Sequence, residues 1–199
     1  ICTDWGAYRH STDEAIATEI MERHAGRPAT RQDLNRLRDR FAALIEIEAS
    51  ERPERFTPTP GAAALLRLLP SHGWTPALAT GGWQRTALIK LRTARIDAED
   101  LPAAFADDAQ PREEIIDLAA RRAMAGVAAG IATPTIVYIG DGVWDVTAAH
   151  RRGYGFIGVA REPRATQLRA AGADTVLPDL ADAERVLASL NQRSARTSS

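Results

Sequence analysis

The stretch TIVYIGDGVWD, residues 135–145, decides the fold class of this sequence. Its first five residues, 135–139, form an apolar and β-branched run that predicts a buried strand. Asp141 then stands at the carboxyl end of that strand, and residues 143–151 follow with a helical pattern. A buried strand that passes at once into a helix is typical of parallel sheets, in which helices cover both faces.

The same alternation continues on both sides of this stretch. Short apolar runs predict strands over residues 74–79, 103–106, 156–159 and 174–177. Helical patterns lie between them, over residues 61–70, 83–95, 111–124, 164–171 and 182–190. Repeated β-then-α units predict an α/β fold with a parallel sheet, and in such sheets ligands bind at the carboxyl ends of the strands.

The first fifty residues follow a different pattern, because they indicate two helices without strands. Ser11 with Glu14 resembles the capping box that opens a helix, and Thr30 with Asp33 opens a second helix. Three prolines between residues 51 and 60 predict a hinge. We therefore divide the chain into a helical segment, an α/β core and a flexible tail, over residues 10–52, 57–190 and 191–199.

Composition excludes several classes of function. A formal net charge of −1 gives no bulk attraction to nucleic acid or to an anionic membrane, and no apolar run reaches the length of about 18 residues that spans a bilayer. The single cysteine, Cys2, allows no internal disulfide, which fits a reducing cytoplasm. We expect a cytoplasmic protein whose partner is a small molecule. The sequence does not determine the oligomeric state.

Two aspartates of the opening stretch are candidate metal ligands. Asp141 stands at the strand end, and Asp145 lies four residues later in the first turn of the helix. Carboxylates that meet at a strand end make a hard oxygen site suited to Mg²⁺. The alternative is that Asp141 caps the helix while Asp145 favours its positive N-terminal end.

Two further stretches suggest a site for an anion. In PALATGG, residues 76–82, a strand ends in Thr80 and glycines follow, which is an arrangement that cradles phosphate; alternatively, Thr80 is an ordinary helix cap. In DDAQPREEII, residues 107–116, Arg112 lies at a helix start, where a cation is unfavourable unless it faces an anion. A solvated arginine among acidic neighbours is the alternative there.

The order of these three stretches resembles motifs II, III and IV of the haloacid dehalogenase superfamily. The resemblance covers residues 56–190, and the preceding helical segment stands in the position of a C1-type cap, as in phosphoglycolate phosphatases. Motif IV with its strand, followed by GYGFIGV at residues 153–159, is the most specific part. The family places these motifs on a Rossmann-like core.

What the resemblance implies is a Mg²⁺-dependent phosphomonoesterase that acts on a small phosphorylated metabolite through an aspartyl-phosphate. By the match, Thr80 and Gly81 would bind the phosphoryl group, and Asp141 with Asp145 would hold Mg²⁺. The lysine of motif III has no lysine counterpart here, so either Arg112 or Gln110 fills that position. We favour Arg112, because a guanidinium neutralises phosphate and binds it bidentately.

One departure from the family is serious, because the D-x-D-x-T motif that holds the nucleophilic aspartate occurs nowhere in the chain. The first eight residues, ICTDWGAY, look like the continuation of that motif. We therefore expect the nucleophile upstream of Ile1, and an inactive chain that lacks the central motif I strand of the sheet. The alternative is a nucleophile-less family member that binds a phosphorylated ligand or a protein partner without turnover.

Overall fold

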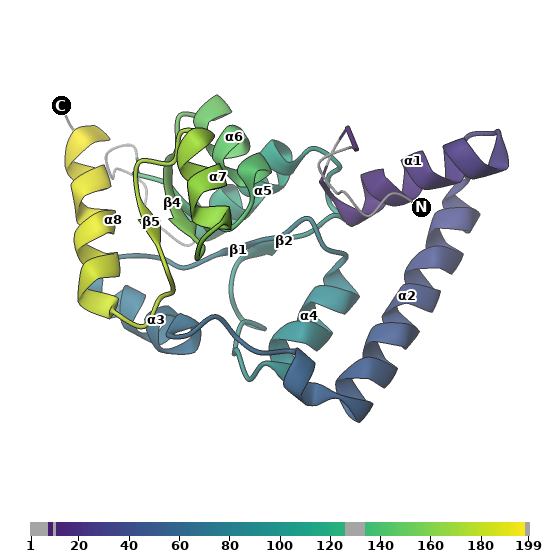
Figure 1. Cartoon of the computed structure of the whole chain (residues 1–199), viewed down its shortest axis with the longest axis horizontal. Coiled ribbons are helices and arrows are strands. Elements are labelled where there is room, and N and C mark those ends of the chain that lie inside the picture. The colour runs from purple at the N-terminus through teal and green to yellow at the C-terminus, as the bar shows by residue number, and fades with distance from the viewer. Residues whose placement is uncertain (1–7, 10, 126–133, 198–199) are drawn as a thin grey trace. The chain divides into compact units, whose positions relative to one another are not determined.

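The structure, a computed structural model, describes residues 8–9, 11–125 and 134–197 (Figure 1). The chain forms two compact units, each made of two segments. The first unit contains Ile1–Pro58 and Ala77–Ala119, and the second contains Thr59–Pro76 and Ala120–Ser199. The segment Ile1–Ala7, which the resemblance treats as the continuation of motif I, lies outside the described residues. Within the described ranges no helix is long and apolar enough to cross a membrane.

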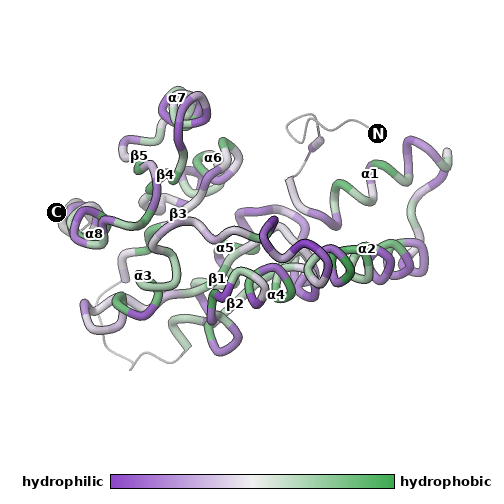
Figure 2. The backbone as a smooth tube through the Cα atoms, turned by 60° about the horizontal axis from the view of Figure 1, so that its bottom comes forward, coloured by the Kyte–Doolittle hydropathy of each residue, from purple (hydrophilic) through white to green (hydrophobic). Residues whose placement is uncertain are grey.

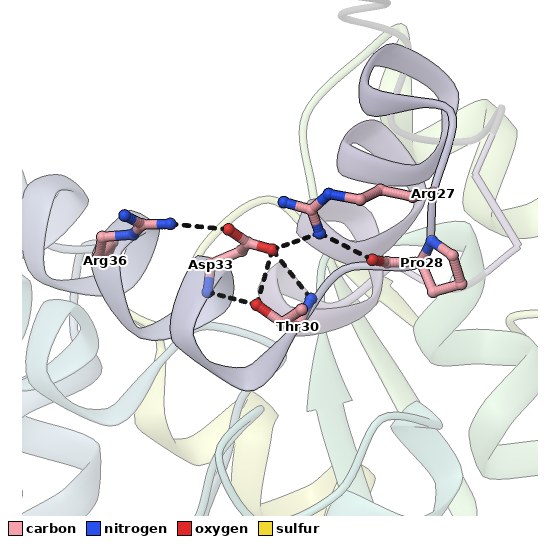
Figure 3. A network of polar contacts seen from close by, with 5 residues as sticks. All are labelled: Arg27, Pro28, Thr30, Asp33 and Arg36. Carbon is pink, nitrogen blue, oxygen red and sulfur yellow. Dashed lines mark hydrogen bonds and ion pairs between the residues drawn. The ribbon is translucent and has the colours of Figure 1, made fainter.

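The first unit begins with a helical hairpin whose turn is fixed by one carboxylate. Helix α1 (Asp13–Ala25) ends at Gly26 in the left-handed conformation, and helix α2 (Arg31–Glu51) begins with the predicted capping box of Thr30 and Asp33. Asp33 also accepts from Arg27 at 2.7 Å and from Arg36 at 2.9 Å (Figure 3). These bonds, first of all that from Arg27, hold the pKa of Asp33 far below its usual range.

Helix α2 packs its apolar stripe on the start of helix α4 (Gln84–Thr93). Figure 2 shows hydrophobic and hydrophilic stretches alternating along α2, as an amphipathic helix requires. Trp83, only 3% exposed, meets the edge of Phe41 with 5.9 Å between ring centroids. Four further residues belong to this cluster, Ala17, Leu34, Leu37 and Ala106. A short 3₁₀ turn over Pro53–Arg55 follows α2 within the predicted hinge.

Two short strands form a parallel ladder in the first unit. Strand β1 (Leu78–Ala79) pairs with β2 (Ala103–Ala104). The first turns of helix α5 (Arg112–Met124) cover this ladder, because Ile115 packs against Ala104. The predicted strand over 74–79 is thus confined to its last two residues. Its first part follows a 3₁₀ turn, Leu69–His72, and Trp74 instead packs into the core of the second unit.

The second unit is a three-stranded parallel sheet with helices on both faces. Its strands are β3 (Val137–Gly140), β4 (Gly155–Val159) and β5 (Val176–Leu177), in the order β3-β4-β5. Adjacent residues of β4 point to opposite faces, as strand geometry demands. Phe156 meets α6 (Val143–Arg151) and α7 (Arg164–Ala170) on one face. Ile157 meets α3 (Ala62–Leu68) and α8 (Ala183–Thr197) on the other.

Helix α8 continues beyond the end that the sequence pattern predicted. It runs to Thr197, whereas we predicted that the helix ends at residue 190 and that the chain then frays. Two side chains attach the extension to the rest of the unit. Asn191 accepts from the Trp74 indole at 3.4 Å, and Arg193 pairs with Asp174 at 3.1 Å. Both partners are remote in sequence, which is why periodicity alone could not reveal them.

The predicted fold class is confirmed, because the chain is an α/β protein whose strand pairs are all parallel among the described residues. Among the described residues the strands form two ladders, β1-β2 and β3-β4-β5. The division into a helical segment, a core and a tail stays a prediction, and so does the absence of a central strand.

Candidate functional site

Thr80 opens a tight turn between β1 and α4, which we call the Thr80 loop (residues 80–83). Its backbone N–H extends the ladder by donating to Ala104 O at 3.1 Å, and its Oγ1 accepts from Gly82 N at 3.1 Å. Thr80 does not cap α4, because the capping position of that helix is Trp83. The threonine side chain therefore shapes the loop rather than the helix.

The Arg112 side chain lies directly against the Thr80 loop. A Cβ atom at Gly81 would lie 2.4 Å from Arg112 Nη2, so only glycine allows the guanidinium this close to the backbone. The guanidinium also donates from Nη2 to Ser11 O at 2.7 Å and from Nε to Ser11 Oγ at 3.2 Å. Three of the predicted site residues, Thr80, Gly81 and Arg112, are thus neighbours. Arg112, and not the motif III alternative Gln110, is shown in contact with the loop.

Asp13, which sequence reasoning missed, attaches to the same loop at two points. Its backbone N–H donates to Gly81 O at 2.7 Å, and its Oδ2 accepts from Trp83 N at 3.0 Å. Burial raises the pKa of the Asp13 carboxyl, while the Trp83 N–H and the positive charges of Lys90 and Arg112 oppose that rise. The only sequence signal was an aspartate in the first turn of a helix, where many serve the helix alone.

The predicted capping box of Ser11 and Glu14 is wrong. The capping position of α1 is Thr12, and no side-chain bond closes that end. Ser11 instead accepts from Arg112, and the Glu14 carboxylate accepts from the Trp83 indole at 2.8 Å. Both side chains therefore bond to residues far away in sequence instead of closing the capping box.

The two aspartates of the opening stretch lie in a second turn, which we call the Asp141 turn (residues 140–145). The Asp141 side chain is 66% exposed and pairs with Arg164 at 3.3 Å. Asp145 is 3% exposed; its Oδ2 accepts from Gly142 N at 3.0 Å and its Oδ1 from Tyr138 Oη at 3.1 Å. The helix-start alternative holds in part, because Asp145 braces the helix start whereas Asp141 does not cap it.

These donors fit a magnesium ion in number and kind. Among the described residues no group of three or more His, Cys, Asp or Glu side chains could hold a metal. Mg²⁺, however, typically keeps several waters and takes one or two carboxylates together with substrate phosphate. Asp141 offers an exposed carboxylate, and Asp145 adds a second carboxylate four residues later in the same turn.

The predicted site residues are divided between the two units. Thr80, Gly81 and Arg112 belong to the first unit, and Asp141 with Asp145 belongs to the second. That the two groups meet in one cavity stays a prediction. Thr80 and Gly81 follow the carboxyl end of β1, Asp141 and Asp145 follow that of β3, and Arg112 is the first residue of α5.

The chain is similar to known proteins both in sequence and in fold. Residues 7–153 match the family described as "Hydrolase: haloacid dehalogenase-like hydrolase". The fold is similar to a hydrolase from Pseudomonas syringae, with 25% identity, 81% of this chain and 74% of that chain covered, and a TM-score of 0.61. It is also similar to a phosphonoacetaldehyde hydrolase-like protein from Oleispira antarctica, with 20% identity, coverage of 90% and 72%, and a TM-score of 0.62. A search of curated protein sequences gave no match.

Proposed function

Because this chain belongs to the haloacid dehalogenase-like hydrolase family, we propose that it is a Mg²⁺-dependent phosphomonoester hydrolase. Its substrate class is a small phosphorylated metabolite, and the phosphoryl group passes through an aspartyl-phosphate. We place its action in the cytoplasm, without nucleic acid or membrane partners. The formal net charge of −1 supports that restriction, because it offers no bulk attraction to polyanions.

The proposal is supported chiefly by the position of the Arg112 guanidinium, which lies against the backbone of Gly81, the residue after Thr80. A phosphoryl group in transfer carries charge on its oxygens, and preorganised donors stabilise that charge without reorganising. Arg112 supplies the positive charge that the family obtains from a lysine. Thr80 supplies a hydroxyl that can donate a hydrogen bond to a phosphoryl oxygen.

Asp141 and Asp145 are the residues that would hold Mg²⁺. The bound ion would neutralise charge on the phosphoryl oxygens. Asp141 would bind the ion from an exposed position, in place of its ion pair with Arg164. Asp145 accepts hydrogen bonds from Gly142 and Tyr138, so it would also keep the turn in shape.

The nucleophile is the part of the proposal that these residues do not supply. The 199 residues contain no D-x-D-x-T, and we expect that aspartate before Ile1. Its carboxylate oxygen would bond to phosphorus while the ester oxygen leaves and takes a proton. Water would then cleave the acyl phosphate and restore the carboxylate. Thr80 and Arg112 act in both steps, since the same oxygens carry the charge.

The test compares the 199-residue chain with the same chain preceded by an added segment that carries the D-x-D-x-T motif. We expect the extended chain to release phosphate from p-nitrophenyl phosphate with Mg²⁺ and to lose that activity with EDTA. The Thr80→Ala and Arg112→Ala variants should each reduce kcat/KM at least about a hundredfold. An extended chain that binds phosphate without turnover would instead support the inactive, ligand-binding alternative.

A further inference from the structure

We propose that Asp13 is a positioning residue for the Thr80 loop, holding Gly81 and Trp83 in the backbone arrangement that Arg112 lies against. The inference rests on the proposed function, because it assumes that this loop and Arg112 receive the phosphoryl group. Asp13 would touch neither the substrate nor the ion. It would act through the backbone of the loop.

The first argument is that Asp13 attaches to both ends of the loop's glycine pair. The Asp13 N–H donates to Gly81 O at 2.7 Å, and the Asp13 carboxylate accepts from Trp83 N at 3.0 Å. Gly82 lies between these two bonded residues. A built Cβ on Gly82 would lie 3.7 Å from the Asp13 carboxylate. Glycines have the widest backbone freedom of any residue, so two fixed points on either side remove much of it.

A second argument is that the two residues before Asp13, Ser11 and Thr12, bond to Arg112 and to Gln110 at the start of α5. Ser11 accepts two bonds from the Arg112 guanidinium, and Thr12 Oγ1 donates to Gln110 O at 2.9 Å. Thr12 is fully buried. Three consecutive residues, 11–13, therefore fix the loop and the start of α5 with respect to each other.

The charge at Asp13 is a cost rather than a benefit to an anion site. A carboxylate near the loop repels a phosphoryl group, and its burial raises its pKa, while Lys90 and Arg112 offset part of that effect and Asp107 adds to it. What the loop needs from Asp13 is thus the hydrogen-bond acceptor. Asparagine keeps an acceptor of the same shape without the charge, so the two contributions can be separated.

The experiment measures sulfate binding to the 199-residue chain by calorimetry, because sulfate keeps its charge across the working pH range. We expect Asp13→Ala to weaken binding about tenfold, which corresponds to about 1.4 kcal/mol. Asp13→Asn should bind as tightly as the wild type or more tightly. Amide exchange followed by NMR should show the Trp83 N–H losing protection in Asp13→Ala and keeping it in Asp13→Asn.

Asp107→Ala is the matched control. Asp107 accepts from Gln84 N, the next amide of the same helix, at 2.6 Å, but it pairs with Arg38 and not with the loop. Its loss should weaken α4 and leave sulfate affinity within about twofold. Equal losses in Asp107→Ala and Asp13→Ala would overturn the positioning role, since helix capping would then explain both.

The remaining outcomes separate the two proposals. If the wild type binds sulfate and Asp13→Ala binds it equally well, the positioning role is wrong and the proposed function stands. If the wild type binds no sulfate, or Arg112→Ala binds it as well as the wild type, the proposed function is wrong and this inference falls with it. Should Asp13→Ala fail to fold, Asp13→Asn decides: binding tenfold weaker than the wild type contradicts the inference.

Discussion

The Thr80 loop and the Asp141 turn are both strand-to-helix turns at the carboxyl end of a parallel strand, yet they are held in different ways. The Thr80 loop and its arginine depend on partners far away in sequence: Asp13 is 70 positions from Trp83, and Ser11 is 101 positions from Arg112. The Asp141 turn is closed from within, since Tyr138 and Asp145 are seven positions apart and Gly142 is three from Asp145.

The difference teaches which parts of a site are self-contained. A turn closed by its own residues forms wherever its strand and helix form. The shape of a loop held by residues 11–13 depends on how those residues pack against it. Substitutions should therefore act on the Asp141 turn through local stability, and on the Thr80 loop through a long-range attachment.

The largest expected effect tests the local closure of the Asp141 turn. Asp145→Ala removes an acceptor that is 3% exposed and leaves the Gly142 N–H and the Tyr138 hydroxyl without it. We expect the free energy of unfolding to fall by about 2–4 kcal/mol, as for a buried network that loses one partner. Urea denaturation followed by circular dichroism measures the loss.

Asp141→Ala is the control for that prediction. The Asp141 side chain is 66% exposed and its single described partner is an exposed arginine. Its loss should change the free energy of unfolding by no more than about 0.5 kcal/mol. Similar losses in the two variants would show that the turn is not closed by Asp145 alone.

A smaller loss should follow from cutting the long-range bond between Thr12 and Gln110, which lies just before α5. Thr12→Val removes a buried hydroxyl and leaves Gln110 O without that donor. We expect the free energy of unfolding to fall by about 1–2 kcal/mol. Thr12→Ser keeps the hydroxyl and should keep the hydrogen bond. If Val and Ser cost the same in urea denaturation, the bond contributes nothing and the attachment argument is weakened.

The contribution of Asp13 to the free energy of unfolding should change with pH in the direction opposite to that of a carboxylate whose pKa is lowered. Because the pKa of Asp13 is raised in the folded state, its favourable contribution is present below the ordinary value of about 3.9 and is lost as the pH rises through the folded pKa. The wild type should therefore gain stability relative to Asp13→Asn as the pH falls from 7 to about 3.5. Melting temperatures of both proteins at the two pH values measure this.

Asp33 provides the opposite case in the same chain. Its pKa is lowered, chiefly by the hydrogen bond from Arg27, so its contribution is present above about pH 3.9 and is lost as the pH falls toward the folded pKa. The wild type should lose stability relative to Asp33→Asn over the same interval. If the two variants shift in the same direction, burial does not control the Asp13 carboxyl as described.

The smallest effect concerns the exposed side of the Asp141 turn. Arg164 pairs with Asp141 at 3.3 Å while its own side chain is 61% exposed, so Arg164→Gln should remove a weak competitor for a metal ion. We expect Mn²⁺ affinity, measured by calorimetry, to rise at most about fivefold. Arg161→Gln breaks an exposed pair with Asp179 and should leave that affinity unchanged. An equal rise in both variants would indicate a general charge effect.

Two predicted capping boxes show where sequence reasoning succeeded and where it failed. The box of Thr30 and Asp33 forms as predicted, because both partners lie within one helix turn, and Asp33 keeps it while also accepting from Arg27 and Arg36. The box of Ser11 and Glu14 does not form. Arg112 binds Ser11, while Trp83 and Arg38 bind Glu14, and all three lie in other elements.

The strands show the same difference between local features, which were predicted, and features set by remote partners, which were not. Periodicity located each of the five strands that the structure describes, because burial between helices leaves an apolar run in the sequence. Their extent was less well predicted. Strand β1 has two residues where we expected six, since Trp74 belongs to another core. Helix α8 is longer than predicted because Asn191 and Arg193 find partners outside it.

The sequence by itself determined the α/β class and the parallel pairing, because these follow from periodicity and from residue order. It also placed Thr80, Asp141 and Asp145 after strand ends and Arg112 at a helix start. Only the tertiary structure decided that Arg112 lies against Gly81, that Asp145 is buried while Asp141 is exposed, and that Asp13 holds the Thr80 loop. Those contacts join residues up to 70 positions apart. A hydrogen bond of that span depends on how elements pack, and packing leaves no local pattern to read.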